Sequence, residues 1–217
     1  MNYELINNNR VYLSGTVENN PTFSHESFGE AFYEVNLLVP RLSNHLDTVP
    51  VTVSEKLLSG GKFEIGKYVC IKGQFRSYNK LENGKSKLML TVFVREVCEF
   101  EEDMNPNIIE ITGYICKEPT YRTTPFNREI CDVLIAVNRA YNKSDYLPCI
   151  AWGRNAKFVS ELAVGTKISM VGRIQSREYQ KHTELGETIT KTAYEVSINK
   201  IQKEEDMGVI TNVEEDA

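Results

Sequence analysis

A repeat of about one hundred residues constrains this chain more than any other feature of its 217-residue sequence. Residues of the first half recur 98 positions later: Gly15 as Gly113, Pro21 as Pro119, Arg41 as Arg139, and Val49-Pro50-Val51 as Leu147-Pro148-Cys149. Further along the offset becomes 99, which relates Gly66 to Gly165 and Gly73 to Gly172. A period of this length is far too long for a solenoid unit, so we expect two copies of one small domain.

Each copy has the sequence pattern of a mostly β domain. Apolar, β-branched and aromatic residues alternate with polar ones at period two, as half-buried strands require. The pattern predicts strands over Arg10–Val17, Tyr33–Val39, Val49–Val53, Tyr68–Arg76 and Leu88–Val97, and again over Ile108–Ile115, Ile130–Val137, Leu147–Trp152, Lys167–Gln175 and Thr190–Ile201. One short helix is expected between the third and fourth strands of each copy, over Ser54–Leu58 and Gly153–Ala163.

Five strands with a helix between the third and the fourth are the element order of an oligonucleotide-binding (OB) barrel. A sandwich of the immunoglobulin type would need more strands and no helix at that point. We therefore predict an all-β protein of two tandem five-stranded OB-fold barrels, with one short helix per repeat. The first barrel is expected to span residues 1–98 and the second residues 107–202, with an acidic linker over 99–106 and an acidic flexible tail over 203–217.

The charge of the chain is unevenly distributed. The net charge of −5 argues against indiscriminate binding to polyanions. Between Asn105 and Lys203, however, 14 basic residues stand against 10 acidic ones, whereas the excess acid lies in the linker and the tail. In the second copy these cations interleave with aromatic residues on short strand segments. A groove for single-stranded nucleic acid needs this mixture, because bases stack on flat rings and cations neutralise phosphates.

Metal and enzyme chemistry find little support. The five cysteines, Cys70, Cys98, Cys116, Cys131 and Cys149, are widely spaced without a Cys-x-x-Cys pair, and the three histidines are scattered. The cysteines are expected to be buried thiols in a reducing compartment. Nucleotide-binding and nucleophile motifs are absent, so we expect neither a catalytic residue nor a cofactor. The start Met1–Ile6 lacks the pattern of a signal peptide, and no apolar run approaches the length of a membrane span, which predicts a cytoplasmic protein.

The second copy resembles the bacterial single-stranded DNA-binding protein family. The resemblance runs along nearly the whole copy, through Asn107–Gly113, Lys117–Thr124, Leu134–Arg139, Ala151–Ala156, Val164–Gly165, Val171–Tyr179 and Thr192–Val196. Each of these motifs is weak alone, but their order and spacing together are fairly specific. The resemblance implies sequence-independent binding and protection of single-stranded DNA in replication, recombination or repair, by a bacterial protein that is associated with the nucleoid when bound.

The resemblance also implies a set of binding residues. Four aromatic residues stand at the positions where the family stacks bases: Tyr141, Tyr146, Trp152 and Tyr179. The candidate phosphate contacts are Arg122, Arg128, Arg139, Lys143, Arg154, Lys157, Arg173, Arg177 and Lys181. The alternative for any one aromatic is a place in the core, since rings favour strands generally. The alternative for any one cation is a solvated surface position. Because Arg173, Gln175 and Arg177 alternate along one strand, all three are predicted to face the same side, opposite Ile174.

The first copy departs from the family at the stacking positions. Its equivalents by offset are Ser43, Thr48, Ser54 and Lys80, none of which has a ring. We therefore expect the first barrel to be mainly a structural or oligomerising module. Family members commonly assemble four barrels, so the resemblance implies a homodimer, and association through the first barrel would also cover an exposed strand edge. The end Val213–Ala217 is acidic but lacks the apolar tip of relatives, which argues against recruitment of repair or replication enzymes by that route.

Two other functions stay open. The barrels could be a scaffold for protein interaction, with the aromatic residues in the core or at a protein interface. The same groove chemistry also suits single-stranded RNA, because both nucleic acids offer stacking faces and phosphates. The sequence does not separate DNA from RNA.

Overall fold

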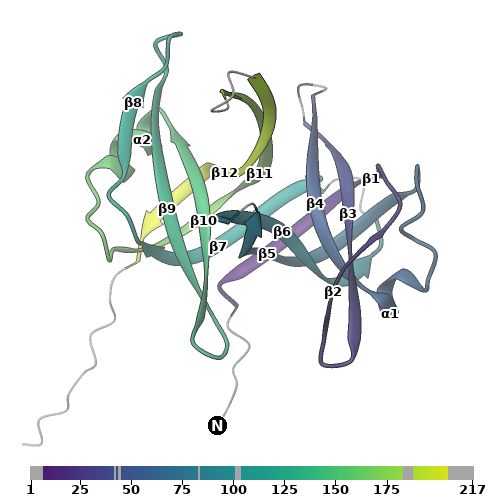
Figure 1. Ribbon diagram of the computed structural model, residues 1–217. Helices are drawn as coiled ribbons and strands as arrows, with labels where there is room; N and C mark the ends of the chain where they lie inside the picture. The colour runs from purple at the N-terminus through teal and green to yellow at the C-terminus, as the bar shows by residue number, and fades with distance from the viewer. Residues whose placement is uncertain are drawn as a thin grey trace, which may run out of the picture.

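The computed structural model describes residues 7–41, 43, 45–82, 84–100, 104–182 and 188–204 (Figure 1). The first barrel comprises β1 (Asn9–Val17), β2 (Thr22–Ser27), β3 (Glu30–Pro40), β4 (Leu46–Ser54), α1 (Glu55–Leu58), β5 (Tyr68–Glu82) and β6 (Lys85–Cys98). The second comprises β7 (Asn107–Ile115), β8 (Thr120–Thr123), β9 (Glu129–Arg139), β10 (Lys143–Trp152), α2 (Arg154–Ser160), β11 (Lys167–His182) and β12 (Thr188–Lys203). The predicted all-β class, with two tandem barrels and a short helix in each, is confirmed.

Each barrel closes in the same way. In the first, β1 pairs with both β3 and β5, and β4 pairs in parallel with β6. In the second, β7 pairs with β9 and β11, and β10 pairs in parallel with β12. The repeated glycine of the first strand makes closure possible: a Cβ on Gly15 would lie 2.5 Å from the Leu38 carbonyl oxygen, and one on Gly113 would lie 2.6 Å from that of Ala136. Any side chain here would push the crossing strands apart.

The core follows the predicted alternation. Val35, Leu37 and Val39 on β3 are buried, as are their equivalents Val133, Ile135 and Val137 on β9. Three of the cysteines, Cys70, Cys131 and Cys149, are buried, while Cys98 and Cys116 are half-buried, and all five are free thiols. Burial raises the pKa of each of these thiols. The thiols therefore behave as small apolar side chains.

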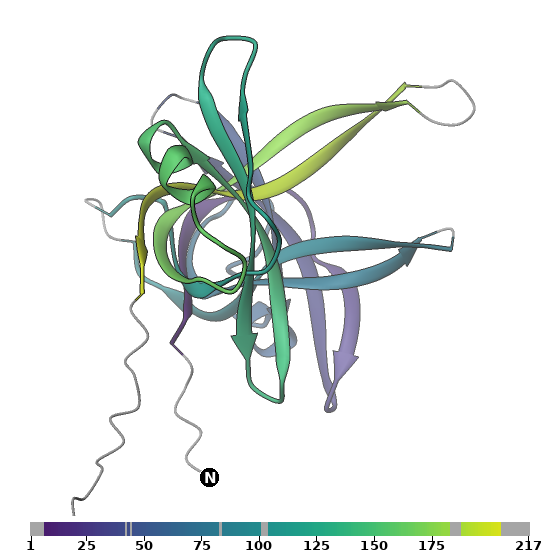
Figure 2. The ribbon, with the colours of Figure 1, turned by 90° about the vertical axis from the view of Figure 1, so that its left-hand side faces the viewer.

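The structure differs from the prediction at the hairpins. Strands β2 and β8 were not predicted, because each is a short polar strand with no fully buried residue. Strands β5 and β11 run six and seven residues past their predicted ends, whereas β6 and β12 begin only three and two residues before their predicted starts. The four strands form two long hairpins whose ends no core-facing alternation marks. Both hairpins project from the same side of the molecule (Figure 2). Helix α2 ends at Ser160, three residues before the predicted end.

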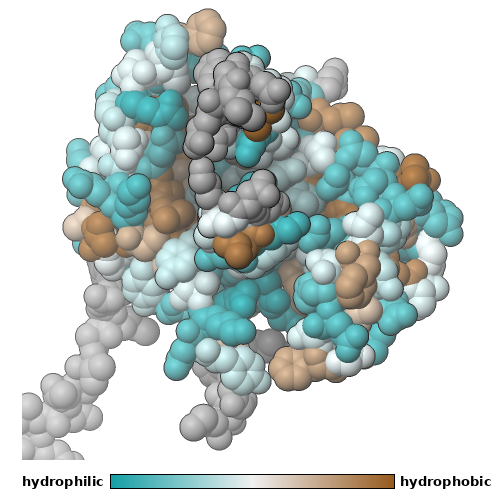
Figure 3. All heavy atoms as spheres, in the orientation of Figure 1, coloured by the Kyte–Doolittle hydropathy of each residue, from teal (hydrophilic) through white to brown (hydrophobic). Residues whose placement is uncertain are grey.

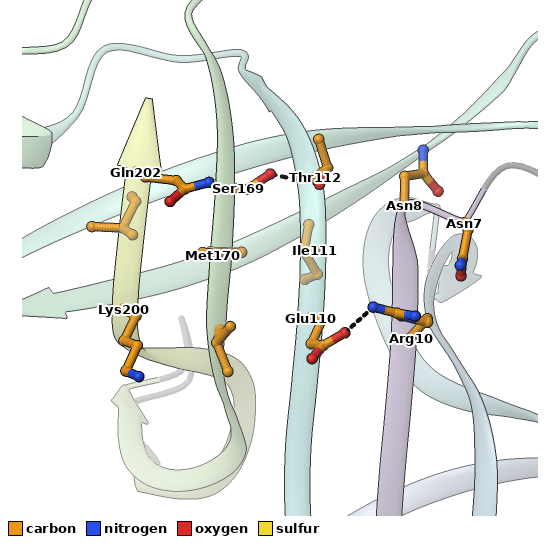
Figure 4. Close-up of a pocket in the computed structure, with 12 residues that line it drawn as sticks. Asn7, Asn8, Arg10, Glu110, Ile111, Thr112, Ser169, Met170, Lys200 and Gln202 are labelled. Atoms are coloured by element: carbon orange, nitrogen blue, oxygen red, sulfur yellow. Dashed lines mark hydrogen bonds and ion pairs between the residues drawn. The ribbon is translucent and has the colours of Figure 1, made fainter. Parts of the chain in front are cut away.

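The two barrels are joined edge to edge. Strand β1 pairs antiparallel with β7, which merges all twelve strands into one sheet. A cross-strand ion pair, Arg10–Glu110, and a hydrogen bond between the hydroxyls of Thr112 and Ser169 (2.7 Å) lie on the surface of this junction (Figure 4). The sequence predicts a homodimer whose association through the first barrel would cover an exposed strand edge. In the structure β7 of the same chain covers the β1 edge.

Side chains tie the junction together reciprocally. The Asp47 carboxylate, fully buried in the first barrel, accepts a hydrogen bond from the Ser176 backbone N–H of the second (2.7 Å). Its equivalent Asp145 accepts one from the Ser77 N–H of the first (2.8 Å). A buried carboxylate is costly unless it is paired and hydrogen-bonded. Each barrel therefore stabilises the buried aspartate of the other by donating a backbone N–H.

The segment between the barrels is partly described. Residues 101–103 and the tail after Glu204 lie outside the described residues, so the predicted linker and tail are not seen as wholes. At the linker's end the Pro106 carbonyl accepts a hydrogen bond from the Ser14 N–H (2.8 Å), so this part of the linker is anchored to β1. Neither of the two short helices among the described residues could cross a membrane.

Candidate nucleic-acid interface

A groove with a volume of about 790 Å³ lies on the second barrel and reaches the first. Its floor is apolar and comes from Ile130 on β9 and from Ile150 and Trp152 on β10. Ile150 and Trp152 alternate with Cys149 and Ala151, which point into the core, so the period of the strand places the indole on the groove side. A flat ring on an apolar floor is suited to stacking against a base.

Arginines surround this floor. The five that line the groove are Arg41, Arg122, Arg128, Arg173 and Arg177, against the carboxylates of Glu178 and Glu195. Arg173, Gln175 and Arg177 all line it from β11, whereas Ile174 between them is fully buried, as the alternation predicts. Asp47 and Asp132 also pair with Arg41 and Arg122, so a small excess of positive charge remains, which favours an anionic ligand along the groove.

The groove arginines differ in how fully they are neutralised. Arg122 donates from Nε to Asp132 (2.7 Å), and this hydrogen bond raises its pKa. Arg173 donates to the neutral side chain of Gln175 (3.1 Å). Its pKa is lowered, first by burial and then by repulsion from Arg41, which outweigh the attraction of Asp47. An anion at Arg173 would therefore relieve an unfavourable charge that the folded chain leaves in place.

The predicted aromatic residues do not lie in the core. Tyr141 is 81% exposed, Tyr146 47%, Tyr179 39% and Trp152 38%. Tyr141 occupies the tight turn between β9 and β10 with a φ of 61°, a left-handed conformation that holds its ring outward. The guanidinium of Arg177 lies 6.0 Å from the Tyr179 ring centre, so a cation and a ring adjoin on β11. These rings are therefore accessible to a ligand.

The predicted residues divide between several places. Trp152, Arg122, Arg128, Arg173 and Arg177 share the groove. Arg154 and Lys157 lie on α2, outside its lining, and Lys157 pairs with Glu129 (3.0 Å). Tyr141, Arg139 and Lys143 instead line a hollow that belongs mainly to the first barrel. Lys181 lies on β11 opposite Ile189, but its side chain lies outside the described residues.

Sequence reasoning missed the contribution of the first barrel to this groove. Arg41, His45, Leu46 and Thr48 line it from the β3–β4 hairpin. The Thr48 backbone N–H donates to the Ser176 hydroxyl (3.2 Å), which holds this hairpin against β11. No local pattern predicts that contact, because it depends on the β1–β7 pairing between repeats.

Metal binding finds no support on the described surface, and the junction hollow is a weaker candidate site than the groove. The face in Figure 3 is mostly hydrophilic, with apolar residues in small separate patches. Within the described part of the chain, no cluster of three or more His, Cys, Asp or Glu side chains could hold a metal ion. In the junction hollow of Figure 4, Arg10 pairs with Glu110 and the hydroxyl of Thr112 with that of Ser169, and no aromatic ring lines the hollow, so the groove is the stronger candidate site.

The second barrel is similar to known proteins. The model of the "Single-strand binding protein family" matches residues 106–203. Single-stranded DNA-binding protein 1 of Staphylococcus aureus (strain COL) is 32% identical over 81 residues, which cover 34% of this chain and 48% of that protein. Single-stranded DNA-binding protein A of Bacillus subtilis (strain 168) is 30% identical over 81 residues, with 34% and 47% covered. The chain thus spans about half the length of these curated relatives.

The likeness to solved structures extends over both barrels. The wild-type single-stranded DNA binding protein from Thermus aquaticus aligns with a TM-score of 0.66 at 20% identity, covering 91% of this chain and 93% of that chain. At this identity the likeness concerns the fold alone. It extends the comparison to the first barrel, which the family model does not match.

Proposed function

Since residues 106–203 match the single-strand binding protein family, we propose that the chain binds single-stranded DNA without sequence preference and protects it during replication, recombination or repair. The observation that carries the proposal is the groove in which the Trp152 ring lies among five arginines. Bases would stack on the rings, and the arginines would neutralise the phosphates. The role is binding without catalysis.

The chemistry of the groove accounts for the lack of sequence preference. Every base presents a flat face, and stacking is worth about 1–3 kcal/mol per base whatever its identity. Arginine contacts to phosphates carry no sequence information. Tyr146 and Tyr179, exposed on β10 and β11, would extend the stacking surface beyond Trp152.

We also propose that two chains associate into a homodimer with four barrels. Because β1 pairs with β7 inside the chain, the dimer would use the outer face of the junction sheet rather than a free β1 edge. Tyr68 and Phe100 support this choice: they are about half exposed, and their rings meet edge to face at 5.4 Å on that side. In a bacterial cell the proposed ligand would bring the protein to the nucleoid, within the cytoplasm.

Quenching of tryptophan fluorescence tests the binding proposal. Trp152 is the single tryptophan, so stacked bases should quench the signal of the full chain on titration with oligothymidine. Duplex DNA of the same length should quench little, because its bases are not free to stack. Oligouridine measures the RNA alternative directly. A chain that responds to none of these strands would act as a protein-interaction scaffold instead.

A further inference from the structure

Three arginines gather where the first barrel meets the second. Arg76 and Arg95, on β5 and β6, each donate to the Gln74 side-chain oxygen, at 2.8 and 3.3 Å. Arg139 of β9 comes from the second barrel and donates to Asp145 (3.2 Å). Two of these cations thus share one neutral acceptor and the third pairs with Asp145, while Glu30 and Glu34 line the surrounding hollows.

The charge of this cluster is poorly balanced. Burial lowers the pKa of Arg76 to about 10, and repulsion from Arg95 and Arg139 adds to the effect. The Nε of Arg76 is buried and finds no hydrogen-bond acceptor among the described residues. Burial also raises the pKa of Asp145, although Ser77 and Arg139 act against this. A buried donor without a partner beside two further cations is suited to an anion such as a phosphate.

Aromatic rings surround the same arginines. The Arg76 guanidinium lies 4.0 Å from the Phe93 ring centre, and that of Arg95 lies 5.2 Å away. Phe93 packs against Phe32, with ring centres 5.5 Å apart. Two adjoining hollows, of about 640 and 730 Å³, share these rings together with Arg76, Arg139 and Lys143. One hollow reaches the exposed Phe23, and the other reaches Phe28 at the β2–β3 turn.

This arrangement is not a copy of the groove on the second barrel. At the offset of 99, Arg76 corresponds to Gln175, which donates to the buried Glu195 (2.8 Å). The parallel strand pairs relate Phe93 to Ser197, because Val51 pairs with Val92 as Cys149 pairs with Val196. The rings absent from Ser43, Thr48, Ser54 and Lys80 are therefore replaced by rings at other positions of the same barrel face.

We propose that the first barrel holds a second site for single-stranded DNA, with a phosphate at Arg76, Arg95 and Arg139 and bases against Phe23, Phe28 and Tyr141. The proposal rests on the proposed function, since it assigns the same ligand to another groove. It replaces the expectation that the first barrel is mainly structural. Because Tyr141 and Lys143 belong to the second barrel, one strand can pass from one groove to the other across this turn.

The test compares two strand lengths on the full chain. A strand of about 10 nucleotides fits one barrel, whereas one of about 35 reaches both, since a barrel of this type takes roughly 4–16 nucleotides. The variant Arg95→Ala/Phe28→Asn changes two exposed side chains, and asparagine accepts the left-handed φ of 51° at position 28. It should leave Trp152 quenching by the short strand unchanged and weaken binding of the long strand about 10–100-fold.

The matched control is Lys67→Ala, which removes an exposed cation of the first barrel that pairs with Glu64 (2.7 Å). It should bind both strands as the wild type does. Arg76→Gln, which introduces the residue of the second barrel, should reproduce the loss for the long strand, with folding checked by circular dichroism. If both Arg95→Ala/Phe28→Asn and Arg76→Gln bind the long strand as tightly as the wild type, the second site is overturned. The arginines would then be assigned to an acidic protein partner. Loss of short-strand quenching in the wild type would instead contradict the proposed function.

Discussion

Val11 pairs directly with Ile109, the residue that stands 98 positions later and is its own equivalent in the second barrel. An antiparallel pair of equivalent residues marks a local twofold axis, and both side chains are buried. The same axis relates Asn9 to Asn107. The Asn9 side chain forms hydrogen bonds with the backbone of Phe75, and the Asn107 side chain forms the same bonds with that of Ile174. Two separate copies of such a domain would make this contact by dimerising, and here one chain makes it internally.

The two equivalent aspartates of the junction should not be equally important. Asp47 accepts from Arg41 Nε at 2.6 Å, and although burial alone would raise its pKa, the bonds from Arg41 and Ser176 leave the pKa lowered. Burial dominates at Asp145, whose pKa is raised. We expect Asp47→Asn to destabilise the chain at pH 7 by about 3 kcal/mol, as for breaking a buried pair. Asp145→Asn should cost clearly less, as measured by chemical unfolding.

The pH dependence of these variants has opposite signs. A lowered folded pKa stabilises the chain above the unfolded value of about 4, and that contribution disappears as the pH falls through the folded pKa. The penalty of Asp47→Asn should therefore shrink below about pH 4. A raised folded pKa means that ionisation of Asp145 destabilises the folded chain. The difference in unfolding free energy between the wild type and Asp145→Asn should therefore be most favourable to the variant at neutral pH. Arg10→Ala, which breaks an exposed pair with Glu110, should cost under about 1 kcal/mol at any pH.

The sequence predicted the barrels better than it predicted their contacts. Local alternation at Val35, Leu37 and Val39 marks a strand, because every second residue must enter the core. The polar hairpin ends and β2 carry no such period. The resemblance places Arg139 and Lys143 in one binding surface with Trp152, but they lie against the first barrel, since a long-range strand pairing decides which barrel a turn faces. Phe93 was overlooked for the same reason.

Binding should weaken steeply with salt. For single strands, the logarithm of the binding constant falls by about 0.7 per neutralised phosphate for each tenfold rise in salt. Five groove arginines then predict a slope of about −3 to −4. Arg128→Ala should reduce the slope by about 0.7, whereas Lys200→Ala, an exposed cation of the second barrel outside the groove, should not. Fluorescence titrations at several salt concentrations measure this, and a salt-independent affinity would favour the scaffold function.

Light scattering tests the proposed homodimer. The full chain should have twice its chain mass of 24.8 kDa at micromolar concentration. Phe100→Asp places a charge in the proposed contact next to Tyr68 and should yield monomers, because an unpaired charge is costly in an apolar interface. Ile65→Asp changes a similarly exposed apolar residue in the loop before β5 and should leave the dimer intact. A wild-type monomer would leave the pair of exposed rings without the role assigned here.

Trp152 should contribute more to binding than any other single ring of the groove on the second barrel. It is the aromatic ring that lies on the apolar floor of that groove among the arginines. Trp152→Ala should weaken binding of oligothymidine by roughly 10–100-fold, which corresponds to one stacked base. Trp152→Phe keeps a flat ring and should recover most of the affinity. Since the indole is 38% exposed, both variants should fold.

Fluorescence anisotropy of a labelled strand gives these affinities without using the tryptophan signal. Phe158→Ala removes an equally exposed ring on α2, outside the groove, and serves as the control for loss of any aromatic residue. Equal losses for Phe158→Ala and Trp152→Ala would mean that the measured effect arises from packing around α2. Wild-type affinity for Trp152→Ala would move the stacking function to Tyr146 and Tyr179, which the same assay can then test one ring at a time.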